Sequence, residues 1–80
     1  MDTRDAVADR IKTLCRQNKI TPNSLSYRSG VPQSTIKSIL NNETRNPGIV
    51  TIKKLCDGLN ITLPEFFNTE TFFNLEQEIK

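Results

Sequence analysis

Two helix-start signals stand only ten residues apart in the middle of the chain, and each of them contains a proline. Thr21-Pro22 offers a hydroxyl that can cap a helix, followed by a proline suited to the first helical position. Further on, Gly30 can adopt the left-handed conformation that ends a helix, and Val31-Pro32 then starts another. Two short helices joined by a tight turn that contains glycine are typical of a helix-turn-helix unit. The chain is therefore expected to hold such a unit over residues 21–41.

Apolar residues recur at helical spacing through most of the remaining chain, and no stretch alternates in the way of a strand. The first helix is expected to begin after a cap at Asp2 or Thr3 and to fade between Gln17 and Lys19. Its apolar stripe consists of Val7, Ile11, Leu14 and Cys15. The stripe of a later helix consists of Ile49, Ile52, Leu55, Cys56 and Leu59.

Two asparagines and a Thr–Glu pair mark further helix ends. Asn42 is expected to end the helix that begins at Pro32, because asparagine tolerates the left-handed conformation better than most residues. Asn60 is expected to end the next helix for the same reason. Thr62 and Glu65 have the spacing of a capping box, which indicates the start of a short fifth helix.

The tail over residues 68–80 follows a cluster of aromatic residues, since all four phenylalanines fall within residues 66–73. Helical spacing relates Phe72, Leu75 and Ile79, and Glu76 with Lys80 forms a supporting pair one turn apart. We expect a sixth helix that covers the core. The alternative is a dimer contact near the chain end, made by Phe72, Phe73 and Leu75.

The fold class predicted from these signals is all-α: one helix after another over residues 1–67, followed by a short C-terminal helix. A chain of 80 residues suffices for one small domain and leaves no second domain to house a small-molecule effector site. No apolar stretch approaches the length that spans a membrane, and the N-terminus is charged rather than signal-like.

Residue usage argues against an enzyme or a metal protein. The chain has no histidine, which removes the commonest general base and metal ligand. Cys15 and Cys56 stand far apart at apolar positions, so they are expected to be reduced, buried core residues; a disulfide or redox switch is the alternative. The carboxylates form no recognisable catalytic pair, and no glycine-rich phosphate loop exists. We expect no enzymatic activity, no cofactor and no metal.

The net charge of +2 conceals an uneven distribution along the chain. Residues 10–54 carry nine basic side chains against Glu43 alone, whereas residues 55–80 carry five acidic side chains against Lys80. Residues 1–9 are also acidic on balance. A basic middle between acidic ends favours a face that attracts polyanions, although an unevenly charged solvated surface would give the same counts.

The helix expected over residues 32–41 separates its side chains into two faces. At about 100° per residue, one arc is apolar or β-branched and the other is wholly polar. The polar arc lacks a carboxylate, which suits a polyanion because an acidic group there would repel phosphate. Its members are Gln33, Ser34, Lys37, Ser38 and Asn41.

The run from Arg10 to Phe67 resembles the Xre/Cro/CI-type helix-turn-helix domain of bacterial and phage transcriptional regulators. Each matching piece is short, and their order and spacing together carry the resemblance. In order they are Ile11-Lys12, residues 21–30, residues 31–36, Arg45-Asn46-Pro47 and residues 61–67. The resemblance implies a compact bundle of about five helices whose third helix enters the major groove of DNA.

The resemblance also assigns contacts residue by residue. It implies base contacts by Gln33, Ser34, Lys37 and Ser38, and glutamine can pair with adenine while serine can bond to any base. It implies phosphate contacts by Thr21, Asn23, Asn41 and Arg45, which would fix the register on the duplex rather than read its sequence.

The chain departs from the family pattern at several positions. Pro22 stands where a phosphate-binding glutamine is frequent, and Pro32 replaces the usual Ser or Thr cap, so the start of the recognition helix is expected to shift by a residue. Ser26 replaces the customary alanine where the two helices pack, and Leu40 replaces a frequent glutamate. Asn42 and Asn60 replace common glycines. The overall match is retained.

By this resemblance the chain is a sequence-specific DNA-binding regulator, most simply a repressor, with double-stranded DNA as its partner. It would act as a homodimer on an inverted repeat, with recognition helices roughly 34–36 Å apart. The alternative is a protein-interaction module, an adaptor or an antitoxin-like partner, that keeps the fold without reading DNA. We expect a cytoplasmic protein encoded by a bacterium, a phage or a plasmid.

Overall fold

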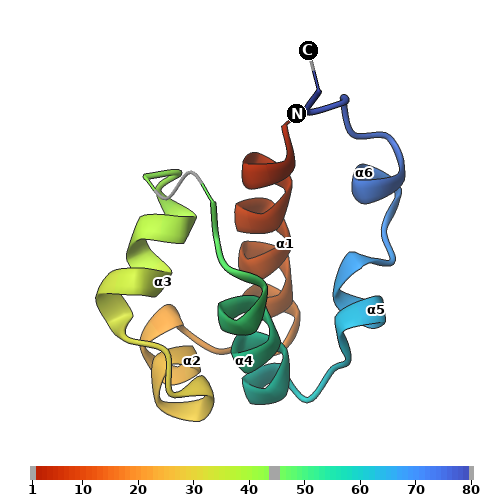
Figure 1. Cartoon of the computed structure of the whole chain (residues 1–80). Helices are drawn as coiled ribbons and strands as arrows, with labels where there is room; N and C mark the ends of the chain where they lie inside the picture. Colours follow the sequence, from red (N-terminus) through yellow and green to blue (C-terminus); the bar gives the residue numbers. More distant parts are fainter. Residues whose placement is uncertain (1, 44–45, 80) are drawn as a thin grey trace.

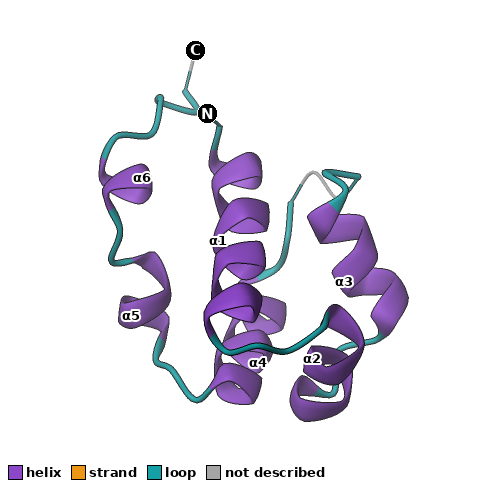
Figure 2. Cartoon of the chain, turned by 180° about the vertical axis from the view of Figure 1, so that it is seen from behind, coloured by secondary structure: helices purple, strands orange, loops and turns teal. Residues whose placement is uncertain are grey.

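A computed structural model describes residues 2–43 and 46–79 of the chain, which within those ranges forms six helices and no strand. The helices are α1 (Thr3–Gln17), α2 (Pro22–Ser29), α3 (Gln33–Leu40), α4 (Ile49–Leu59), α5 (Leu63–Phe67) and α6 (Glu70–Phe73). In Figures 1 and 2, α1 and α4 form the centre, with α2 and α3 on one side and α5 and α6 on the other. The all-α fold predicted from the sequence is confirmed.

Local signals set most of the helix ends. The Asp2 carboxylate caps α1 by accepting a hydrogen bond from the Asp5 amide at 2.8 Å. Gly30, Asn42 and Asn60 are all left-handed, with φ values of 75°, 58° and 60°. Each therefore ends its helix as expected. Lys19 is also left-handed, with φ of 54°. Lysine has no preference for this conformation, so the sequence did not predict the turn.

The core lies where α1, α4 and the helix-turn-helix unit meet, and it is fully apolar. Phe66 of α5 fills its far side and has no exposed surface. The buried members are Val7, Ile11, Leu14, Cys15, Leu25, Val31, Ile36, Ile39, Ile52, Leu55, Cys56, Leu59 and Phe66. Both cysteines are free thiols inside this cluster, and burial raises the pKa of each. They are packing residues, as the sequence predicted.

Close contact between α2 and α4 depends on Gly58. A Cβ atom added there would lie 3.0 Å from the Cβ atom and the backbone nitrogen of Ser29. Because this separation is tighter than nine in ten real Cβ contacts, a larger residue at this position would require Ser29 and its backbone to shift by a few tenths of an ångström.

Two predictions about apolar residues were wrong in part. Ile49 was placed on the buried stripe of α4, but it is the first residue of that helix and 58% exposed, since packing begins one turn later at Ile52. The C-terminal helix was expected to continue through Ile79, but α6 ends at Phe73 and Ile79 is 89% exposed. Residues 74–79 contain too few apolar groups for their burial to offset the conformational entropy lost when another helical turn is ordered. Lys80 lies outside the described residues.

The aromatic cluster is the part of the tail that does cover the core. Phe72 packs its ring 5.0 Å from that of Phe67 and 6.1 Å from that of Phe66, centre to centre. Leu75 is half-buried, whereas Phe73 is 74% exposed. Covering the core is therefore achieved by one turn of helix, not by three.

Candidate nucleic-acid interface

The turn between α2 and α3 is fastened by two serine hydroxyls. Ser26 donates a hydrogen bond to the Val31 carbonyl at 2.6 Å, and Ser29 donates to the Leu25 carbonyl at 2.7 Å. The Ser29 oxygen also accepts a hydrogen bond from the Val31 amide at 3.2 Å. Val31 itself is buried, so the turn is held to the core. These contacts fix the direction in which α3 leaves α2.

The start of α3 follows from the turn. Pro32 occupies the cap position without a side-chain hydrogen bond, and the helix begins at Gln33, one residue later than the start at Pro32 expected from the sequence. Its apolar arc is anchored by Ile36 and Ile39, which are essentially fully buried. The opposite arc consequently faces solvent.

A groove of about 400 Å³ lies between the start of α2 and the exposed arc of α3. It brings together five of the eight residues assigned to DNA contacts in the sequence. Its lining is Pro22, Asn23, Gln33, Ser34, Lys37, Leu40 and Asn41. No carboxylate is present among the lining residues that the structure describes. Pro22 and Leu40, at which the chain departs from the family pattern, supply the apolar part of this surface.

The other three assigned residues differ in their placement. Thr21 caps α2, its hydroxyl oxygen accepting a hydrogen bond from the Ser24 amide at 3.1 Å, which leaves the hydroxyl hydrogen free to donate. Ser38 is half-buried and does not line the groove. Arg45 lies outside the described residues.

Within the residues that the structure describes, the polar side chains of the groove have no hydrogen-bond partners. Gln33, Ser34 and Lys37 are exposed and form no side-chain hydrogen bond or ion pair with any residue in the described part of the chain. The same holds for Asn23 and Asn41. Amide, hydroxyl and ammonium groups that are exposed on one arc and unpaired are available to an external ligand.

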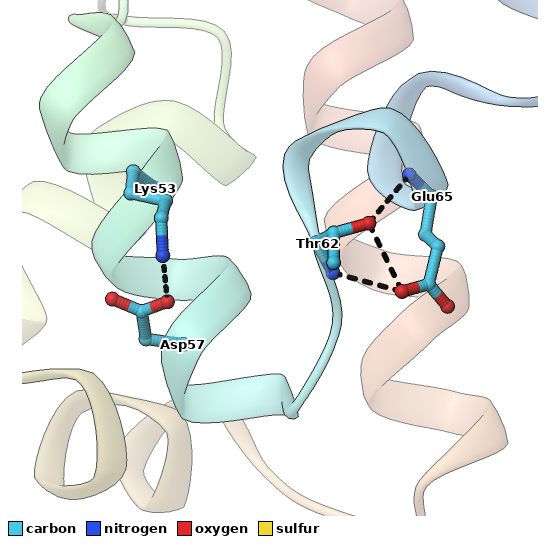
Figure 3. A network of polar contacts seen from close by, with 4 residues as sticks. All are labelled: Lys53, Asp57, Thr62 and Glu65. Carbon is cyan, nitrogen blue, oxygen red and sulfur yellow. Dashed lines mark hydrogen bonds and ion pairs between the residues drawn. The ribbon is translucent and has the colours of Figure 1, made fainter.

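The basic middle of the sequence does not form one surface. Arg10 donates hydrogen bonds to the carbonyls of Phe66 at 2.7 Å and Glu65 at 2.9 Å, which joins α1 to the end of α5. Lys53 forms an ion pair with Asp57 on α4, as Figure 3 shows. These two cations serve internal contacts, so the sequence count overstated the charge available to a polyanion.

No three potential metal ligands gather in the described part of the chain. Among the helices described, none is both long and apolar enough to cross a membrane.

Comparison with known proteins agrees with this geometry. The family model of the Cro/C1-type HTH DNA-binding domain matches residues 10–71. The restriction-modification controller protein C.Esp1396I superposes with a TM-score of 0.74 at 25% identity, over 80% of this chain and 81% of the controller. The prophage Lp1 protein 11 superposes with a TM-score of 0.80 at 29% identity, over 90% of this chain and 96% of the prophage protein. No curated protein sequence matches with significance.

Proposed function

Because the chain belongs to the family of Cro/C1-type helix-turn-helix DNA-binding domains, we propose that it is a transcriptional regulator that inserts α3 into the major groove of a specific DNA site. The observation that carries this proposal is the groove, whose described lining holds no carboxylate and in which the exposed polar groups of α3 have no hydrogen-bond partner within the described part of the chain. An α-helix fits the major groove, where each base pair presents a distinct pattern of donors and acceptors.

The residues divide by the chemistry they offer. Gln33 and Ser34 lie at the start of α3 and read base edges, the glutamine amide suiting adenine. Lys37, one turn further along, reaches a base or a phosphate. Asn23, in the first turn of α2, and Asn41, at the C-terminal cap of α3, line the groove and hold the phosphate backbone, which positions α3 without reading sequence. Ser38 and Arg45 are proposed as DNA contacts on the basis of the family resemblance alone.

A homodimer on an inverted repeat is the natural form of this regulator. A single domain of this size covers little DNA, and two copies supply the affinity that one lacks. The exposed ring of Phe73, beside Phe72 and Leu75, offers an apolar contact for the second copy. Repression follows if the site overlaps a promoter.

The test is selection from a pool of randomised DNA duplexes at physiological salt, with the purified full chain. The proposal predicts enrichment of a palindrome whose half-sites are about one helical turn apart, roughly 34–36 Å. Enrichment of a single half-site would support sequence reading by α3 and contradict the homodimer. If no sequence were enriched and the weak binding were uniform, α3 would not read DNA, and an interaction module would be the better description.

A further inference from the structure

A second groove, of about 350 Å³, lies where the end of α1 meets the start of α2 and the end of α3. Its lining is Lys12, Cys15, Arg16, Ile20, Pro22 and Leu40. Two of these residues, Pro22 and Leu40, also line the groove of α3, so the two hollows share a wall. The resemblance assigned no contact to Lys12 or Arg16.

The second groove has an apolar floor and a basic rim. Cys15 is buried, and Ile20 and Leu40 are half-buried, whereas the Lys12 and Arg16 side chains are exposed. Lys12 and Arg16 are one helical turn apart on α1 and therefore share a face. No carboxylate is present among the described residues that line this groove.

We infer that this groove binds the DNA sugar–phosphate backbone where the strand passes beyond the base-reading surface of α3, with Lys12 and Arg16 binding its phosphates. This inference rests on the proposed function and extends its contact surface from the helix-turn-helix unit onto α1. Two cations on a groove whose described lining holds no carboxylate match consecutive phosphates, and the apolar floor matches the hydrocarbon faces of deoxyribose.

A merely structural role for these cations makes a different prediction. Arg16 lies in the last turn of α1, where a positive charge stabilises the helix dipole, and its guanidinium donates to the Thr13 hydroxyl at 3.3 Å. That role would appear in the thermal stability of the free protein. Phosphate binding would appear instead in the salt dependence of DNA affinity.

The experiment measures DNA affinity against salt concentration for the full chain, using a mixed-sequence duplex of about two helical turns. Each phosphate neutralised contributes about 0.9 to the slope of log affinity against log salt, so the double variant Lys12→Gln/Arg16→Gln should lower the slope by about 1.8. Between 50 and 200 mM salt, the affinity ratio of wild type to variant should therefore shrink roughly tenfold.

The matched control is Lys53→Gln/Lys54→Gln, which removes the same charge from α4 at positions that line neither groove. Its slope should stay close to that of the wild type. The charge-retaining variant Lys12→Arg/Arg16→Lys should also keep the slope. If the double variant melted early, the single variants would each be expected to lower the slope by about 0.9.

The outcomes separate the two proposals. A wild-type chain that binds no duplex would overturn the proposed function itself. A wild type that binds normally while the Lys12 and Arg16 variants match the α4 control would overturn only the present inference. The second groove would then lie off the path of the DNA.

Discussion

The two sides of the bundle use polar side chains in opposite ways. On the side of α5, the polar groups are bonded to one another: Thr62 and Glu65 complete a reciprocal capping box, and Arg10 binds two carbonyls at the far end of the same helix (Figure 3 shows the capping box). On the side of α3, Gln33 and Ser34 are exposed and bonded to nothing in the described part of the chain.

This difference separates residues that hold the fold from residues kept for a partner. A polar group that is internally bonded contributes to stability, and its loss leaves its partner unsatisfied. An exposed, unpaired group contributes little, so its presence on an arc free of carboxylates needs another reason. Substitutions on the α5 side should therefore change folding, and those on the α3 side should change DNA binding.

The largest expected effect concerns two aromatic residues on the two sides. Phe66→Ala empties a site that is fully buried and should cost about 3–5 kcal/mol of unfolding free energy. Tyr27→Ala on α2 removes a ring that is 86% exposed and should change stability by less than about 0.5 kcal/mol. Chemical denaturation measures both. Comparable losses would mean that the Tyr27 ring is packed.

Arg10 and Lys37 offer a comparison between cations. Arg10→Met removes two charge-assisted hydrogen bonds between α1 and α5 and should cost about 2–3 kcal/mol of stability. Lys37→Met should leave the melting temperature almost unchanged and weaken DNA binding. Calorimetry and a DNA titration on both variants check the pair. If the Arg10 variant were stable and bound DNA poorly, Arg10 would be a DNA contact and not a residue that holds α1 to α5.

Gln33→Ala tests the reading surface directly. It should cost about 1–3 kcal/mol of binding free energy at one base pair and relax the preference there. Unfolding free energy should be unaffected. Binding to duplexes that carry each of the four bases at that position measures the effect. A loss equal for all four would make Gln33 a backbone contact.

Two hydroxyls give a smaller contrast. Thr62→Ala removes the cap of α5 and should lower the unfolding free energy by about 1 kcal/mol. Ser34→Ala removes a hydroxyl that has no hydrogen-bond partner in the described part of the chain and should leave stability within error. Equal costs in thermal melts would show that Ser34 has a structural role.

The smallest effect is a pH dependence at the start of α1. The hydrogen bond from the Asp5 amide, supported by the Arg4 guanidinium 3.9 Å away, holds the pKa of Asp2 below its usual 3.8. The folded pKa is depressed, so this cap stabilises the fold above pH 3.8 and the contribution is lost as the pH falls through the lowered pKa. Asp2→Asn keeps the cap and removes the charge.

The check is the difference in stability between wild type and Asp2→Asn as a function of pH. Relative to Asp2→Asn, the wild type should lose stability only in the acid range below about pH 4. A constant difference down to pH 2 would mean that the Asp2 carboxylate does not carry the cap.

Much of this arrangement could be predicted because it depends on neighbours in sequence. The left-handed ends at Gly30 and Asn60 and the capping box at Thr62 each need only a few residues of context. The groove residues on α3 could be found for a similar reason, since one helix of known period presents them together.

What the sequence did not predict depends on distant partners or on buried area. Arg10 counted as part of a basic middle, but its acceptors lie 55 and 56 residues away on α5. Helical spacing continued to Ile79, yet spacing does not say how much apolar surface a segment will bury. The second groove beside Lys12 exists only because three helix ends meet there.

The most direct test of the difference between the two sides is a map of backbone amide chemical shifts as a DNA duplex is added to the labelled chain. We expect the shifts to move along α3 and at the start of α2, around Gln33, Ser34, Lys37 and Asn23, while α5 and α6 stay still. Shifts centred on Phe66, Phe72 and the capping box, with α3 unmoved, would contradict the assignment of the α3 groove to DNA.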